Sequence, residues 1–228
     1  TLTAPAGAAS RWVHQLGSGS SDYGYAVAAD RAGNTYIAGA TNGRLPGSHE
    51  SNAGGFDVFV AKYSKSGSRS WVHQLGTPSA DYAYGIAVDS AGNAYIAGTT
   101  NGRLGRSPEG NAGDEDVFVA KYSPSGSRAW MHLLGSTGSD NAFGIALDRA
   151  GNPYVVGATQ GRLPGAPEKA AGRFDAFVAK YAANGSRAWV HRLGTTRSDY
   201  GRAVAVDHAG SAYLTGYTEG RMPGATGA

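Results

Sequence analysis

The chain contains four tryptophans, and each lies 59 residues after the previous one, at Trp12, Trp71, Trp130 and Trp189. A histidine follows each tryptophan two positions later, so more than one residue type keeps this spacing. A repeat of this period means that one supersecondary unit is written several times, and that its copies stack to bury a shared core. A residue present in every copy is expected to build the unit. Function should therefore be sought where the copies differ.

Each unit contains four short apolar runs that predict β-strands. In the second unit they lie near residues 70–75, 84–88, 93–98 and 116–122. The runs are rich in Val, Ile, Tyr, Phe and Trp, alternate roughly with period two, and are bounded by turn residues. An Asp-x-x-Gly-Asn segment separates two of them. This segment predicts a hairpin turn, because Asp and Asn bond the local backbone and Gly accepts a positive φ.

Four strands in a unit of this length predict a β-propeller blade, since stacked blades cover each other's faces. The strand with small residues should be innermost, next to the crowded axis, and the tryptophan strand outermost. We therefore predict an all-β fold. Residues 1–228 form a single β-propeller domain with about four blades of four strands, in units of 59 residues that begin near each tryptophan.

The repeated motifs resemble a known family. The repeated unit reads W-x-H-x-L-G, then D-x-x-x-x-x-A-x-D-x-x-G-N-x-Y-x-x-G-x-T, then D-x-F-V-A-K-Y-x-x-x-G, and only the last copy lacks the third part. This pattern resembles the bacterial SBBP β-propeller repeat family over nearly the whole chain. The resemblance implies a propeller fold and an extracytoplasmic or secreted bacterial setting. It implies no catalytic residues.

The register of the copies predicts how the ring closes. Only three third strands are clear, and Thr1–Ala4 stands in the register of the fourth. We predict that residues 11–17 form the outer strand of the last blade, so that the N- and C-terminal segments pair in one irregular blade. The alternative is a ring, of this or a larger size, completed through a second chain.

Composition limits the chemistry. The chain has no cysteine, which excludes disulfides, Cys-based zinc sites and a Cys nucleophile. No apolar run approaches the ~18 residues of a membrane helix, so we expect no membrane span. The net charge of +3 favours weak attraction to acidic glycans. Lys and Arg do not cluster among exposed aromatics, so we expect no specific nucleic-acid partner.

The repeated polar columns are interpreted as architecture. The Asp-x-x-Gly-Asn turns have too few carboxylates for calcium loops, and we expect capped hairpins instead. The histidines should pack between blades with one hydrogen bond each, rather than bind a metal. Aspartates before the strands could pair for glycoside hydrolysis, but they recur in each blade and are expected to bond the backbone. We predict no catalytic residue, no metal site and no cofactor.

The loop after the second strand of each unit contains the candidate ligand site. Its Gly-Arg-Leu/Met core persists while the following stretch varies. In a purely structural interpretation, the leucine tucks beneath the loop and the arginine covers the seam between blades. In the functional interpretation, equivalent pockets around one rim bind a ligand with avidity, as multivalent lectins do. The candidate residues are Arg44, Arg103, Arg162 and Arg221.

We therefore expect a non-enzymatic, exported binding or scaffold module. As a binding module, its ligand would be a carbohydrate or another cell-surface component. As a scaffold, it would bind a protein partner or associate with itself. One alternative is a polysaccharide hydrolase or lyase, which needs a site that breaks the repeat symmetry. The departures from symmetry are Asn141 in place of Tyr, Asp114–Glu115 in a long loop, and Arg202 beside the fourth inner strand. A further alternative is a purely structural repeat module of a larger surface protein, or an engineered repeat protein.

Overall fold

The computed structural model describes residues 12–105, 107, 109–169, 171–222 and 224–226. All regular secondary structure in these described residues is β-strand, as the sequence predicted. The strands are β1 (Asp22–Ala29), β2 (Thr35–Thr41), β3 (Asp57–Tyr63), β4 (Arg69–Leu75), β5 (Asp81–Val88), β6 (Ala94–Thr100), β7 (Asp116–Tyr122), β8 (Arg128–Leu134), β9 (Asp140–Leu147), β10 (Pro153–Thr159), β11 (Asp175–Tyr181), β12 (Arg187–Leu193), β13 (Asp199–Val206) and β14 (Ala212–Thr218).

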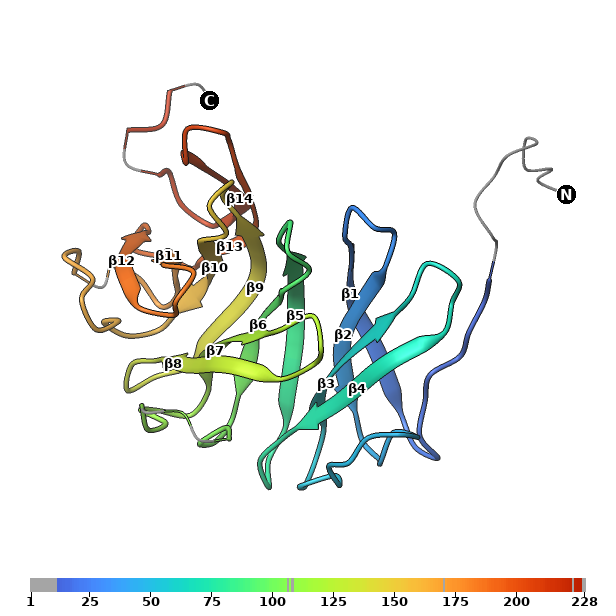
Figure 1. The fold of residues 1–228 in the computed structure, drawn as a ribbon. Helices are drawn as coiled ribbons and strands as arrows, with labels where there is room; N and C mark the ends of the chain where they lie inside the picture. Colours follow the sequence, from blue (N-terminus) through green and yellow to red (C-terminus); the bar gives the residue numbers. More distant parts are fainter. Residues whose placement is uncertain (1–11, 106, 108, 170, 223, 227–228) are drawn as a thin grey trace, which may run out of the picture.

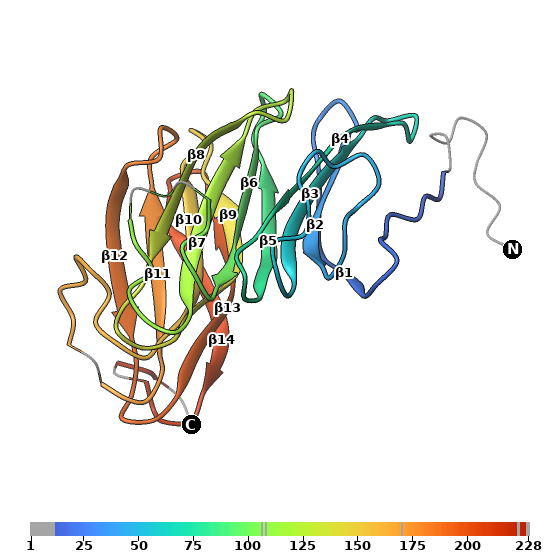
Figure 2. The ribbon, with the colours of Figure 1, turned by 90° about the horizontal axis from the view of Figure 1, so that it is seen from below.

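The strands form four antiparallel sheets that follow one another in an arc (Figure 1). Three sheets have four strands in chain order, and the fourth contains β13 and β14. The first strands of successive sheets contact one another, so β1, β5, β9 and β13 form the inner edge. The tryptophan strands β4, β8 and β12 lie on the outer side (Figure 2). The predicted blades, with small residues inside and tryptophan outside, are confirmed.

The Asp-x-x-Gly-Asn segments of the first three blades, and residues 207–211 with Ser211 in place of Asn in the fourth, form the predicted hairpin turns between the first two strands. In the second blade, Asp89 Oδ1 accepts hydrogen bonds from the backbone N–H groups of Ala91 and Asn93, both at 2.9 Å. Gly92 has a φ of 81°, which L side chains rarely adopt. The carboxylate is thus occupied by its own turn, as expected for a cap.

The hydrophobic core lies between blades. One cluster joins Val58 and Val60 of β3 to Ile96 of β6 and Phe118 of β7, and all four side chains are buried. An equivalent cluster lies between the second and third blades. Each sheet therefore needs a neighbour to bury its faces, which is why the repeat folds as a stack.

The predicted closure of the ring is not seen in the described residues. Within them, β14 pairs only with β13, and the segment from Trp12 to Leu16 forms no strand. Trp12 instead stacks on Tyr63 of the first blade, with ring centroids 5.6 Å apart. The first and fourth sheets lie at opposite ends of the arc, and no described strand bridges them (Figure 1). Thr1–Ala4 lies outside the described residues.

Candidate functional site

The tryptophan and lysine columns tie the first blade to the second and the second to the third. Trp71 Nε1 and Lys62 Nζ both donate hydrogen bonds to the backbone oxygen of Pro124, at 3.1 and 3.2 Å. Trp130 and Lys121 form the same pair of bonds at the next seam. These columns hold the outer edge of one blade against a turn of its neighbour, so their role is architectural.

Each histidine of the outer strands β4, β8 and β12 bonds a glutamate of the long loop through Nδ1. The pairs are His73–Glu50 at 3.0 Å, His132–Glu109 at 3.0 Å and His191–Glu168 at 2.8 Å. The predicted single hydrogen bond is confirmed for these three histidines, whereas His14 contacts the rings of Trp12 and Tyr63. Sequence reasoning missed the glutamates because they lie in a loop that otherwise varies, although they too are spaced by 59 residues.

The glutamates also line two equivalent clefts at the outer rim. The cleft at the first seam has a volume of about 410 Å³ and is lined by Glu50, His73, Tyr122 and Arg128. The next seam repeats it with a volume of about 420 Å³. Burial acts to raise the pKa of Glu50, but hydrogen bonds from His73 and Ser48 outweigh it and lower the pKa. The carboxylate is therefore charged and already bonded within the cleft.

Buried aspartates begin the third strands. Asp57 and Asp116 are fully buried, and their Oδ2 atoms accept backbone hydrogen bonds at 2.9 and 2.7 Å. Their Oδ1 atoms are buried without a partner. Burial raises the pKa of each to about 6, and the charge of the neighbouring Asp81 or Asp140 adds to the effect. The predicted role of bonding the backbone at the strand start is confirmed, and full burial keeps both carboxyl groups away from a polysaccharide.

We expect Asp57 and Asp116 to make the protein more stable at pH 5 than at pH 7.5. Their folded pKa of about 6 exceeds the ordinary value of 3.8, so the folded state binds more protons between these values. The free energy of unfolding therefore falls as the pH rises from about 4 to about 6. Urea titrations of the D57N/D116N double variant should give a flatter pH profile. A profile as steep as that of the unchanged protein would contradict this assignment.

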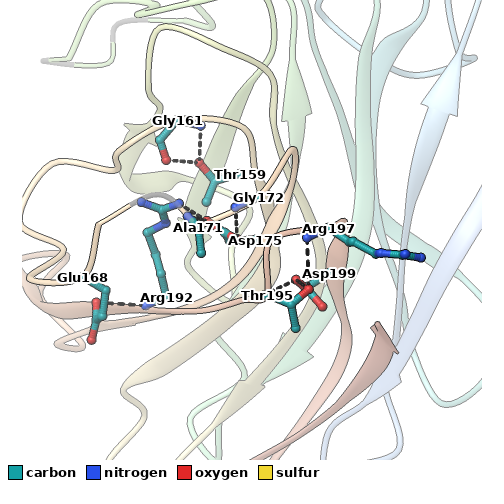
Figure 3. A network of polar contacts seen from close by, with 10 residues as sticks. All are labelled: Thr159, Gly161, Glu168, Ala171, Gly172, Asp175, Arg192, Thr195, Arg197 and Asp199. Atoms are coloured by element: carbon teal, nitrogen blue, oxygen red, sulfur yellow. Dashed lines mark hydrogen bonds and ion pairs between the residues drawn. The ribbon is translucent and has the colours of Figure 1, made fainter. Parts of the chain in front are cut away.

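The third blade departs from this pattern through Arg192, whose equivalents are Gln74 and Leu133. Arg192 forms an ion pair with Asp175, the counterpart of Asp116, and the two side chains are 1% and 2% exposed. Figure 3 shows the guanidinium reaching Asp175 from β12 while Glu168 accepts the backbone N–H of Arg192 at 3.1 Å. In the third blade, the buried Asp175 carboxylate thus has a buried cationic partner. In the first two blades, the equivalent carboxyl groups of Asp57 and Asp116 have none.

A row of four side chains crosses the inner edge of the arc, one from each blade. Every inner strand contains a β-bulge at the same register, and the bulged residues are Tyr25, Tyr84, Phe143 and Arg202. Bulges turn a side chain out of the regular alternation of a strand and are common next to functional sites. We call these four residues the axial row.

Neighbours in the axial row are in contact. The ring centroids of Tyr25 and Tyr84 are 5.1 Å apart, and those of Tyr84 and Phe143 are 6.0 Å apart. The guanidinium carbon of Arg202 lies 4.4 Å from the centroid of Phe143, as in a cation–π pair. The four blades therefore contribute to one continuous surface, unlike the separate rim clefts.

The axial row is partly open to solvent. Tyr25 is 43% exposed, Arg202 is exposed, and Tyr84 and Phe143 are half-buried. Burial raises the pKa of Tyr84 to about 12, with smaller contributions from the neighbouring tyrosines and from Glu115. The hydroxyl groups of the row therefore stay protonated near neutral pH and can donate hydrogen bonds.

The departures from repeat symmetry lie beside this row. At the first seam, the rings of Phe56 and Tyr82 are in contact, with centroids 5.6 Å apart, and the third seam keeps an aromatic pair. At the middle seam both rings are replaced, and Asn141 Nδ2 donates to Glu115 Oε2 at 3.2 Å. Glu115 and Asn141 therefore replace the contacting aromatic pair together, and a hydrogen bond takes the place of the ring contact. Arg202, the third departure, belongs to the axial row itself.

The arginine loops are separate features of individual blades. Leu45, Leu104 and Leu163 are buried beneath their loops, as the structural interpretation predicted. Two of the arginines donate to backbone oxygens of their own loops: Arg44 to Ser48 at 3.2 Å and Arg103 to Ser107 at 3.3 Å. Ligand binding by the exposed side chains of Arg44, Arg103, Arg162 and Arg221 stays a prediction.

Two further features concern metals and membranes. In the described part of the chain, His, Asp and Glu side chains do not come together in groups of three or more that could hold a metal ion. Within the same ranges, no helix has the length and apolar character needed to cross a membrane.

Comparison with known proteins agrees with this architecture. The chain is 26% identical over 194 residues to the "Regulatory protein FlaEY" of Caulobacter vibrioides, and 24% identical over 185 residues to an uncharacterised WD repeat-containing protein of Acanthamoeba polyphaga mimivirus. The matches cover 80% and 66% of this chain but only 20% and 13% of those proteins. The SBBP family, described as a β-propeller repeat, matches residues 11–46, 70–105, 129–164 and 188–221. The chain therefore belongs to the SBBP β-propeller repeat family.

Proposed function

We propose that this β-propeller repeat module is a non-enzymatic binding module, and that the axial row binds a carbohydrate chain bearing acidic groups. The observation that carries the proposal is the row itself, in which all four blades aim a bulged side chain at one surface. The proposed setting is extracytoplasmic or secreted. The resemblance to the SBBP repeat family supports this setting.

The chemistry of the row suits a sugar better than an apolar ligand. Ligand sites combine apolar and aromatic surface with a few polar groups that set orientation. Tyr25 and Tyr84 supply ring faces and protonated hydroxyls, and Phe143 extends the apolar surface. Arg202 is fixed over Phe143 at one end, where its guanidinium can bond a carboxylate through two parallel N–H groups. An acidic sugar would use both parts of this surface.

The proposal is tested by titration calorimetry with a hexasaccharide of galacturonic acid, and with a neutral hexasaccharide of glucose. We expect the acidic oligosaccharide to bind, and Tyr84→Ala to weaken binding by about tenfold or more, because it removes the central ring. Arg202→Ala should remove the preference for the acidic sugar. Circular dichroism would verify that both variants fold.

The matched control is Arg44→Ala, which changes an exposed loop side chain outside the row. It should leave binding unchanged. If Arg44→Ala abolished binding while Tyr84→Ala did not, the ligand site would lie on the loops and the axial row would be excluded. Absence of binding to both oligosaccharides would count against the carbohydrate proposal.

A further inference from the structure

The hairpin turn after each inner strand varies at one position. The four turns read D-R-A-G-N, D-S-A-G-N, D-R-A-G-N and D-H-A-G-S, so the second residue changes while the rest is constant apart from the final serine of the last copy. The varied residues are Arg31, Ser90, Arg149 and His208. In three of the four copies this residue can carry a positive charge, and differences between copies are where function is sought.

The turns of the first three blades line one cavity of about 540 Å³ at the ends of their inner strands. The lining residues are 29–31, 88–91 and 147–151. The inner strands β1, β5 and β9 contact one another in turn, which brings Arg31, Ser90 and Arg149 to the same cavity. We infer that this cavity binds the phosphate groups of an oligophosphate ligand.

The side chains at the varied position have donors to offer. Arg31 and Arg149 are exposed, and within the described residues neither guanidinium forms a hydrogen bond, an ion pair or a ring contact. Ser90 is exposed as well, and its hydroxyl has no partner in the same part of the chain. A guanidinium bonds phosphate through two parallel N–H groups, and a phosphate has three terminal oxygens to share. Two guanidiniums and a hydroxyl therefore suit a phosphate better than a carboxylate, which has two oxygens.

The aspartates of these turns are already occupied, so the cavity does not offer carboxylate ligands to a cation. Asp89 Oδ2 accepts hydrogen bonds from Asn93 Nδ2 at 2.7 Å and from the Tyr95 hydroxyl at 3.2 Å, in addition to the two backbone bonds on Oδ1. Asp30 and Asp148 accept backbone and side-chain bonds from the asparagines of their own turns. The carboxylates thus hold the turns in shape.

A lysine accompanies each of these aspartates, so the arginines determine the excess charge. Lys180 Nζ lies 3.4 Å from Asp148 Oδ2. Lys121 Nζ lies 4.9 Å from the ring centroid of Tyr95, whose hydroxyl donates to Asp89. The first blade repeats this arrangement. Each negative charge therefore has a positive charge of its own blade nearby, and the two arginines add two positive charges, which favour an anion.

The cavity is separate from the axial row. Tyr25 of the row lies four residues before Ala29, the first cavity residue of β1, and this spacing corresponds to about 13 Å along a strand. Tyr84 and Val88 of the second blade have the same spacing. Phosphate binding at the turns therefore goes beyond the proposed glycan surface and is measured independently of it.

Titration calorimetry with inorganic tripolyphosphate tests the inference, with citrate as a multivalent carboxylate for comparison. We expect tripolyphosphate to bind more tightly than citrate. Arg31→Ala and Arg149→Ala should each weaken its binding by about tenfold, because each removes charge-assisted hydrogen bonds. Ser90→Asp should abolish binding, since it brings a negative charge to the cavity. The circular dichroism spectrum should stay unchanged in all three variants, because these side chains hold no contact of the fold.

The matched control is the double variant Arg173→Ala/Arg197→Ala, which removes two positive charges from exposed positions outside the cavity. It should leave tripolyphosphate binding unchanged. Tyr84→Ala should also leave it unchanged, so this test and the test of the axial row fail separately. Equal weakening by the control and by Arg31→Ala/Arg149→Ala would overturn the inference, because net charge alone would then attract the anion. Equal binding of citrate and tripolyphosphate, or no binding of either, would overturn it too.

Discussion

Asp175→Asn is expected to lower the free energy of unfolding by about 3–5 kcal/mol, because it leaves a buried guanidinium without its counter-charge. Arg192 and Asp175 are almost completely buried, and the Nε and Nη1 atoms of Arg192 have no other hydrogen-bond partner. The same substitution in the second blade, Asp116→Asn, should be tolerated. There the buried carboxylate that is present at pH 7.5 has no cationic partner, as its pKa of about 6 reflects, and the neutral amide keeps an oxygen for the hydrogen bond from the backbone N–H of Ala112.

Urea denaturation at pH 7.5 would measure both variants. A second variant separates the ion pair from general damage to the seam: Asp175→Asn combined with Arg192→Leu recreates the neutral arrangement near Leu133 in the second blade. This double variant should recover most of the lost stability, since neither charge is left alone. Equal losses for Asp175→Asn and Asp116→Asn would contradict the distinction between the blades.

Gly98→Ala is expected to cost about 3 kcal/mol or more, because overpacking forces the backbone to move. The added Cβ would lie 1.8 Å from the backbone oxygen of Tyr82 and 2.8 Å from the ring of Phe118. Tyr82 lies two residues before the bulged Tyr84, so the close approach of the two strands at this glycine helps to set the bulge. The substitution should therefore also disturb the axial row.

The matched control is Gly24→Ala in the first inner strand. A Cβ at Gly24 meets nothing within 4 Å, and the equivalent residue of the second blade is Ala83. We expect its free energy of unfolding to stay within about 0.5 kcal/mol of the original. Thermal unfolding followed by circular dichroism compares the two variants, and similar melting temperatures for both would show that the glycine column is not needed for strand approach.

The blades could be predicted from the sequence because their causes are local and repeated. Alternation, turn residues and the tryptophan spacing each specify the same unit, so strand order and the outer position of Trp71 followed directly. The predicted closure of the ring, by pairing of the N- and C-terminal segments, is not seen in the described residues. It depends on how residues far apart in the chain meet, and repeat register alone does not determine the distance between the first and last blades.

The candidate site was predictable only in part. The sequence placed the candidate ligand site on the arginine loops, and it noted Asn141, Asp114–Glu115 and Arg202 only as departures from the repeat. The structure places Asn141, Glu115 and Arg202 beside one surface. The bulges that create this surface were missed, since an extra residue in a strand changes the direction of Tyr25 without altering the 59-residue register. The pairing of Asn141 with Glu115 was also hidden, because the two residues are 26 positions apart and belong to different blades.

The most direct test of the axial row as the ligand surface is an NMR titration of the isotopically labelled chain with the galacturonic acid hexasaccharide. The account predicts that the aromatic signals of Tyr25, Tyr84 and Phe143 and the guanidinium signal of Arg202 shift together with one dissociation constant. Signals of Arg44 and Arg103 should stay in place. Shifts confined to the arginine loops, with the four signals of the row unchanged, would contradict it.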